Sequence, residues 1–285
     1  MKIKQPLKSE TVFTYWEGKF PLVNRISTLS IQKVFKERHI HITPETLGDY
    51  IDVDKFPDWV FKTNVGHRSD TIRMSLLKEY GGWWFDCDIL LHKNPQELIE
   101  DRAKSYIWTE AVSEKKFAAH GICAAIMYTP PNSVYINEVY RRGWNFQNSL
   151  KVDPESEEGW VDLMRECISK PALVPGLEVV VGDCAPFYNM DDMNHWWECW
   201  DGTLRLSNFQ YGVQFNTSFI RRSLFLPPHY AELPDRILSL SSVEELKKEF
   251  PESNLAEYAA LENITDAEIN EILLALGHGS PKVYS

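Results

Sequence analysis

The sequence predicts an α/β protein with a mainly parallel central sheet and a helical extension at its carboxyl end. Three observations support this prediction. The chain opens in the order strand, helix, strand; a capped helix that ends at two glycines leads directly into another strand; and the residues after position 240 carry helix caps. A strand–helix–strand unit normally places its two strands parallel in one sheet, so the opening sets the fold class.

The opening unit comprises residues 11–43. Residues 11–16 (TVFTYW) are β-branched and aromatic and predict a strand, residues 22–37 have the apolar spacing of a helix, and residues 39–43 (HIHIT) predict a second strand. Ligands of such units lie outside the carboxyl ends of the strands, which makes Tyr15 and Trp16 candidates for a ligand site. A pair of core aromatic side chains is the competing interpretation, and the strand pattern alone favours it.

A helix is predicted over residues 70–80, with Ser69 as its N-cap and the following Gly-Gly pair as its end. Asp70 and Arg73 are three residues apart and therefore share one face of this helix. With Ser69 as the cap, both side chains are expected near the positive amino-terminal end of the helix, where hydroxyl groups or phosphate oxygens can bind.

One strand is predicted over residues 83–91 (WWFDCDILL), directly after the glycines. Alternation along this strand places Trp84, Asp86 and Asp88 on one face. Two neighbouring carboxylates beside tryptophan lower the stability of the fold, because their like charges repel and are poorly solvated, unless a cation binds between or beside them. A divalent ion that prefers oxygen ligands, Mn²⁺ or Mg²⁺, is therefore expected at Asp86 and Asp88.

The remaining elements are predicted from shorter patterns. They are strands at residues 105–109, 122–128, 177–181 and 211–220, a helix over residues 134–144, and helices after residue 240 that start at capping boxes and end at Gly277.

The composition is that of a globular protein, with 44% hydrophobic and 25% charged residues among 285. It excludes intrinsic disorder and fibrous repeats. The net charge of −11 argues against a general nucleic-acid-binding surface, so no nucleic acid partner is expected. The five cysteines are scattered, which argues against a disulfide framework and a zinc site. No apolar leader or membrane-length stretch is present, so the sequence predicts a cytoplasmic protein without a transmembrane segment.

The string at residues 68–91 resembles the sugar-binding region of the Asp-x-Asp (DXD) glycosyltransferases. That family includes the initiating mannosyltransferases of yeast outer chains, capsular-polysaccharide transferases and the glucosylating bacterial toxins. The resemblance implies a GT-A fold, a nucleoside-diphosphate-sugar donor (UDP-sugar first, GDP-sugar second), a glycan or other hydroxyl acceptor, and Mn²⁺ or Mg²⁺ as cofactor. The positions that fall on the family pattern are Ser69, Asp70, Arg73, Leu77, Gly81, Gly82, Trp84, Asp86 and Asp88.

The same resemblance implies roles for single residues. Asp70 and Arg73 resemble the residues that hold donor-sugar hydroxyls, Asp86 the one that bridges ribose, sugar and metal, and Asp88 the direct metal ligand. Trp16 resembles the residue that stacks on the nucleobase, which reverses the preference for a core role. The implied donor-binding set is Tyr15, Trp16, Ser69, Asp70, Arg73, Trp84 and Asp86.

The chain departs from the family near its end, where many members carry a histidine and this chain has Gln214. Gln214 and Asn216 offer carbonyl oxygens that can complete the metal or diphosphate shell. An equally good interpretation is that Gln214 and Asn216 are ordinary polar residues of a strand.

The acceptor side is less well defined. Asp191 and Asp192 precede three tryptophans at positions 196, 197 and 200, which suggests either an acceptor subsite or an acidic loop beside packed tryptophans. An inverting enzyme also needs a base near the acceptor hydroxyl. The candidates for catalytic residues are Asp86, Asp183, Asp191 and Asp192, together with Asp201 and His120.

Two other functions stay open. A haloacid-dehalogenase-like phosphatase is one, because residues 85–89 (FDCDI) imitate its nucleophile strand, although Leu90 and the late position of the motif oppose it. A non-catalytic nucleotide-sugar or glycan-binding module is the other. The expected organisation is a glycosyltransferase domain over residues 1–240, with a donor part at about 11–95 and an acceptor part at about 96–240, and a helical extension over residues 241–285.

Overall fold

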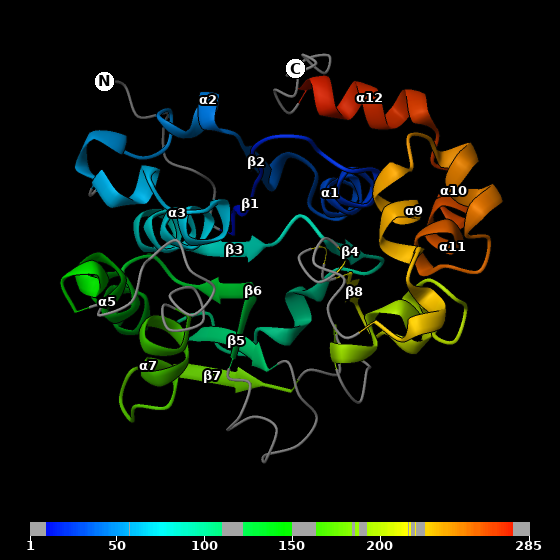
Figure 1. Cartoon of the computed structure of the whole chain (residues 1–285). Coiled ribbons are helices and arrows are strands. Elements are labelled where there is room, and N and C mark those ends of the chain that lie inside the picture. Colours follow the sequence, from blue (N-terminus) through cyan, green and yellow to red (C-terminus); the bar gives the residue numbers. More distant parts are fainter. Residues whose placement is uncertain are drawn as a thin grey trace.

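The fold is described by a computed structural model, in which a central sheet lies between helices (Figure 1). The described residues are 10–56, 58–109, 122–149, 164–183, 186–187, 193–215, 217, 220 and 226–275.

The central sheet has six strands, five of which run in one direction. The exception is the fourth strand of the order, which is antiparallel to both neighbours. The predicted α/β class with a mainly parallel sheet is therefore confirmed. In spatial order the strands are β2 (His39–Ile42), β1 (Val12–Tyr15), β3 (Gly82–Phe85), β6 (Ile122–Thr129), β5 (Ser105–Thr109) and β7 (Val179–Gly182).

The opening unit forms as predicted. β1 pairs in parallel with β2, and helix α1 (Leu22–Phe35) connects them. α1 is buried on nearly all sides: one side packs on the sheet, where Ile31 and Phe35 contact the β3 side chains Trp83 and Phe85, and another packs on the carboxyl-terminal helices. β1 is completely buried, in keeping with its continuous run of apolar and β-branched residues.

Helix α3 (Val65–Tyr80) begins earlier than predicted. Its N-cap is Asn64, whose side chain accepts a hydrogen bond from the His67 N–H at 3.1 Å, so the assignment of Ser69 as N-cap is wrong and Ser69 lies in the second turn. The predicted start lies too far along the chain because the apolar periodicity begins only after residue 70. The predicted end is confirmed: α3 ends at Tyr80, its C-cap Gly81 has a φ of +65°, and a Cβ on Gly81 would lie 2.4 Å from the Pro131 backbone nitrogen.

The predicted strand over residues 83–91 is two strands. β3 ends at Phe85, the Ile89 N–H donates to the Asp86 carbonyl oxygen at 3.1 Å to close a turn, and β4 (Ile89–Leu91) then pairs antiparallel with β8 (Gly212–Gln214). Apolar alternation continues across the turn, which is why the sequence pattern did not reveal it. β8 is also shorter than its predicted span.

The remaining helices cover the sheet and the β4–β8 pair. α3 packs with α5 on the face of the sheet opposite α1, while α9 to α12 gather beside α1 on the other side of the molecule (Figure 1). The bounds are α2 (Pro44–Leu47), α5 (Val134–Ser149), α7 (Lys170–Ala172), α9 (Leu233–Ser239), α10 (Val243–Glu249), α11 (Asn254–Leu261) and α12 (Asp266–Ala275).

Short helical turns join these elements. They are 3₁₀ helices at Lys36–Arg38, Val53–Lys55, Asp58–Phe61, Pro95–Leu98, Met193–Cys199, Leu206–Asn208 and Pro228–Tyr230, and a π-helical turn at Met164–Ser169. Among the described residues, no helix combines the length and apolar character that crossing a membrane requires.

Candidate active site

Asp86 lies where β3 ends, and two donors hold one of its carboxylate oxygens. Oδ1 accepts a hydrogen bond from Trp84 Nε1 at 2.7 Å and one from Arg73 Nη2 at 2.6 Å. Trp84 and Asp86 therefore do share a face, as alternation predicted. The Asp86 side chain is 32% exposed, so part of it remains accessible from solvent.

Arg73 joins Asp86 to Asp70. Its Nη1 lies 3.0 Å from Asp70 Oδ1, and its guanidinium lies 4.8 Å from the ring centroid of Trp84. The Arg73 and Asp70 side chains are only 4% and 5% exposed, and a buried charged group of this kind needs its partner. The predicted neighbourhood of Asp70 and Arg73 is confirmed. Their predicted place at the helix end is wrong, because α3 starts at Val65.

Asp88 lies in the turn after β3, and its two oxygens differ. Oδ2 accepts hydrogen bonds from the Thr217 N–H at 2.9 Å and from Thr217 Oγ1 at 3.0 Å. Oδ1 is buried and has no hydrogen-bond partner. Burial, and secondarily the charge of Asp86, raises the pKa of Asp88 to about 6. A buried carboxylate oxygen without a donor is the kind of atom that a hard cation satisfies.

The turn itself is fixed by Cys87. Its thiol donates to the Tyr15 carbonyl oxygen at 3.3 Å, which ties the Asp-x-Asp turn to the end of β1. Burial raises the pKa of Cys87, so this thiol stays protonated. Alternation had predicted that Asp86 and Asp88 project from one regular strand. They instead lie on either side of the buried Cys87 in a turn.

Tyr15 and Trp16 have different environments at the end of β1. Tyr15 is a core residue whose hydroxyl donates to Glu17 at 2.5 Å. Trp16 is half-buried, its Nε1–H donates to the Lys19 carbonyl oxygen at 3.1 Å, and its ring stacks on Phe20 with centroids 5.1 Å apart. Of the two neighbours, Trp16 is the one whose ring reaches the surface.

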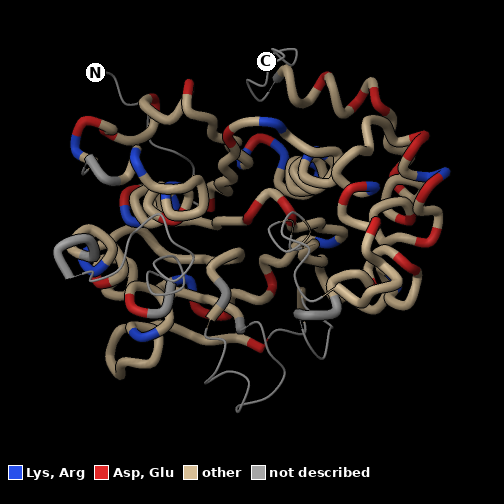
Figure 2. Tube along the Cα trace, viewed as in Figure 1, with Lys and Arg blue, Asp and Glu red and all other residues tan. Residues whose placement is uncertain are grey.

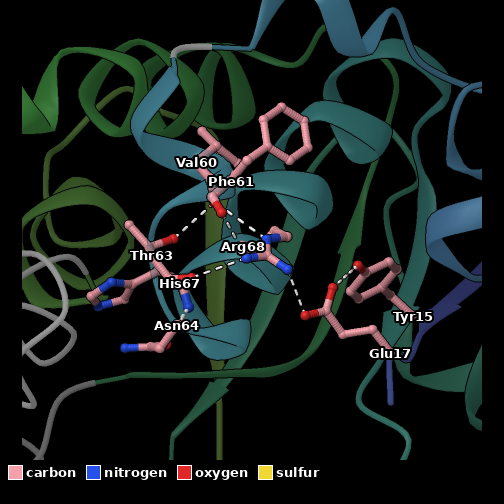
Figure 3. A network of polar contacts seen from close by, with 8 residues as sticks. All are labelled: Tyr15, Glu17, Val60, Phe61, Thr63, Asn64, His67 and Arg68. Atoms are coloured by element: carbon pink, nitrogen blue, oxygen red, sulfur yellow. Dashed lines mark hydrogen bonds and ion pairs between the residues drawn. The ribbon is translucent and has the colours of Figure 1, made fainter. Parts of the chain in front are cut away.

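A polar network joins this end of β1 to the start of α3, as Figure 3 shows. Arg68 Nη1 lies 2.6 Å from Glu17 Oε1, and the rest of its guanidinium donates to the carbonyl oxygens of Val60, Phe61 and Thr63. Sequence reasoning missed Glu17, because its partner lies 51 residues away. Thr217 was missed for the same reason.

Of the other predicted residues within the described ranges, Gln214 lies near the Asp86–Asp88 turn and Asp183 lies far from it. Gln214 is buried in β8, paired with Ile89 beside Asp88. Asp183 is exposed after β7, three strands from β3 in the sheet order and hence about 14 Å across the sheet. The candidates Asp191, Asp192, Asn216 and His120 lie outside the described residues.

Two of the three tryptophans named with the acceptor subsite are core residues. Trp196 and Trp200 are 0% and 2% exposed and pack among the carboxyl-terminal helices, while Trp197 is partly buried against the same cluster. This agrees with the packing that the alternative interpretation expected of the tryptophans. Asp201 accepts a hydrogen bond from the Tyr230 hydroxyl. Within the described ranges, no group of three His, Cys, Asp or Glu residues is placed to hold a metal, so a cation at Asp86 and Asp88 needs ligands from elsewhere.

Solved structures similar to this chain include the PaToxG glycosyltransferase (14% identity, 56% of this chain and 70% of that chain, TM-score 0.39) and a glycosyltransferase involved in the glycosylation of the major capsid of PBCV-1 (10%, 74% and 96%, TM-score 0.45). No curated protein sequence matches the chain.

One family model matches residues 1–149, and its family is described as capsular polysaccharide synthesis protein. The matched range contains β1 to α5 and, with them, Trp16, Asp70, Arg73, Asp86 and Asp88. Because the match covers more than half of the 285 residues, the chain belongs to the capsular polysaccharide synthesis protein family.

Proposed function

We propose that this protein is a metal-dependent glycosyltransferase that moves a sugar from a nucleoside-diphosphate sugar to a hydroxyl group of a saccharide. The observation that carries the proposal is the turn at the end of β3, where Asp86 is fixed by Arg73 and Trp84 while Asp88 keeps one buried oxygen without a donor. Membership of a family named for capsular polysaccharide synthesis supports a saccharide acceptor.

The donor would lie across the carboxyl ends of β1 and β3. We assign the nucleobase to the half-buried ring of Trp16, and the sugar hydroxyls to Asp70 and Arg73 with Ser69 nearby on α3. UDP-sugars are the first choice and GDP-sugars the second. The Arg73 guanidinium holds its two carboxylates in place before any ligand arrives, which lowers the cost of ordering the site.

The residues fit a divalent cation, Mn²⁺ or Mg²⁺. Oδ1 of Asp88 has no donor, Asp86 is partly exposed, and burial, followed by the charge of Asp86, raises the pKa of Asp88. Two carboxylates with diphosphate oxygens are a common ligand set for these ions. The bound cation would offset the negative charge that builds up on the departing diphosphate.

In the proposed reaction the acceptor hydroxyl oxygen forms a bond to the anomeric carbon, and the bond from that carbon to the diphosphate oxygen breaks. The hydroxyl proton passes to a base or, in a retaining enzyme, to the leaving group. Oδ1 of Asp86 is occupied by Arg73 and Trp84, which orients the carboxylate toward the donor. The candidates for this base are Asp183, Asp191, Asp192, Asp201 and His120.

The test is a thermal-shift panel of UDP- and GDP-sugars, each with and without Mn²⁺. A ligand that binds only the folded state raises the melting temperature, so we expect a shift for one nucleotide class that depends on Mn²⁺. Asp88→Asn should abolish this shift, while Asp54→Asn, which changes an exposed carboxylate, should keep it.

Three outcomes separate this proposal from its competitors. No shift with any nucleotide sugar would contradict it. Release of phosphate from p-nitrophenyl phosphate would favour the phosphatase. Nucleotide-sugar binding without donor hydrolysis or transfer to any saccharide acceptor would favour a binding module.

A further inference from the structure

We infer that a cleft among the carboxyl-terminal helices binds one neutral sugar unit of a saccharide. The cleft lies between Asp201, the 3₁₀ helix Pro228–Tyr230, α9 and the end of α10, and its volume is about 380 Å³. That volume is at the lower end of the range for small-molecule sites. The inference rests on the proposed function only in identifying the sugar as part of the acceptor.

One side of the cleft is aromatic and firmly held. Trp200 and Phe250 are 2% and 5% exposed and meet edge to face with centroids 5.4 Å apart. Tyr230 is half-buried, and its hydroxyl donates to Asp201 Oδ2 at 2.5 Å, which fixes the ring. Of these three rings, Tyr230 is the one that is partly exposed, and the buried pair lines the same cleft. An aromatic face whose rotamer is already fixed suits the C–H face of a sugar ring at little entropic cost.

The polar side of the cleft favours an uncharged ligand over an anion. Arg236 is the only Lys or Arg side chain among the described residues that line it. Its Nη2 lies 3.0 Å from Glu249 Oε2 and its guanidinium 4.9 Å from the Phe250 centroid, so its charge is already paired. Asp201 and Glu232 add negative charge, and Figure 2 shows that acidic positions predominate along α9 to α12. Phosphate is disfavoured here, whereas hydroxyl groups can donate to the carboxylates.

The cleft is separate from the proposed donor site. The rings of Trp200 and Phe215 lie 5.4 Å apart, and the Phe215 N–H donates to the Asp88 carbonyl oxygen at 3.0 Å. These two rings therefore stand between the cleft and the Asp-x-Asp turn. A sugar in the cleft is not the reacting unit, so it would be a more distant unit of the same saccharide chain.

The experiment measures binding of four probes: the methyl glycosides of glucose, galactose and mannose, and N-acetylglucosamine. The readout is NMR of the full chain with ¹⁵N-labelled tryptophan indoles. We expect at least one probe to shift the Trp200 resonance in a saturable way at millimolar concentration. Tyr230→Ala, which removes the ring, and Ala231→Phe, which fills the cleft, should each weaken that binding roughly 10-fold or more.

Trp200 and Phe250 are left unchanged because they belong to the core. The matched control is Tyr140→Ala, which removes a part-buried tyrosine from α5, outside the cleft, and should not change probe binding. Melting temperatures of all variants establish that each is folded.

The inference is overturned if none of the four probes binds, or if they bind Tyr230→Ala and Ala231→Phe as they bind the wild type. It is also overturned if inorganic phosphate displaces the bound sugar from Trp200, since that would reveal an anion site. UDP-sugar binding with Mn²⁺ is measured on the same samples and should be unchanged in the cleft variants. If the wild type binds the sugars and no nucleotide sugar, the proposed function fails while this inference stands.

Discussion

Thr217→Val is the substitution that most directly tests how the Asp88 carboxylate is oriented to bind a cation. Thr217 donates twice to Asp88 Oδ2, from its N–H at 2.9 Å and from its hydroxyl at 3.0 Å. Valine has nearly the same shape, keeps the backbone donor and removes only the hydroxyl. The Asp88 carboxylate then loses one of the two donors to Oδ2 that hold Oδ1 in its present direction.

The expected magnitude follows from the type of bond that is lost. A hydrogen bond to a charged group contributes about 1.5–3 kcal/mol, and both partners here are buried. Loss of an outer-shell partner of a metal-ligating carboxylate typically weakens metal binding by about 10- to 100-fold. We therefore expect Thr217→Val to weaken Mn²⁺ binding in the presence of UDP by that factor, with a moderate fall in melting temperature.

The assay is a titration of Mn²⁺ followed by electron paramagnetic resonance of the free ion, at a pH above the raised pKa of Asp88. Thr217→Ser should recover most of the affinity because it restores the hydroxyl. Thr129→Val is the control: Thr129 is also buried and bonds to Ser105 and Ser133, but it lies beside Gly82, at the other end of β3. A lower melting temperature with unchanged Mn²⁺ affinity in Thr217→Val would refute the positioning role.

Three further changes test separate parts of the argument. Asp88→Asn should remove Mn²⁺-dependent donor hydrolysis without lowering the melting temperature, because burial already disfavours the charged form of this carboxyl group; wild-type hydrolysis would exclude Asp88 as a ligand. Trp16→Ala should weaken UDP binding by roughly 5- to 150-fold, the effect of ~1–3 kcal/mol of base stacking, and a large drop in melting temperature with unchanged affinity would instead make Trp16 a core residue. Burial lowers the pKa of His39 to about 3, so between that pH and about 6.5 the unfolded chain binds a proton that the folded chain does not, and stability falls as pH falls. His39→Gln should remove a slope of up to roughly 1.4 kcal/mol per pH unit relative to the wild type in urea titrations, and equal slopes in the two proteins would show that His39 is not buried in its neutral form.

The parts of the fold that the sequence predicted are those set by neighbouring residues. β1, α1 and β2 follow from alternation and helical spacing within a few residues, and the end of α3 follows from the glycine pair. Asp70 and Arg73 pair as expected from one helix turn, and Trp84 and Asp86 share a face as expected from strand alternation. The Arg73–Asp86 ion pair joins the two sets and depends on how α3 packs on β3, which neither pattern specifies.

The parts that the sequence did not predict depend on residues far along the chain. β3 ends at Phe85 because the following residues pair with β8, and nothing between residues 83 and 91 carries that information. The Arg68–Glu17 ion pair and the Thr217–Asp88 hydrogen bonds likewise join separate elements. The early start of α3 is the exception, since the Asn64 cap is local and lies before the apolar pattern begins.

The two carboxylates of the Asp-x-Asp turn gain their hydrogen-bond partners at different times during synthesis. Asp86 finds Arg73 and Trp84 among residues already made, whereas Thr217 lies 129 residues after Asp88. At the usual pace of a ribosome, that distance takes roughly 6 to 26 s to translate. During this interval the nascent chain can build the sheet around β1 and β3 while Asp88 lacks both its hydrogen-bond donors and the β8 strand. Under the proposed function, cation binding is therefore acquired late, after most of the family-matched segment has had time to fold.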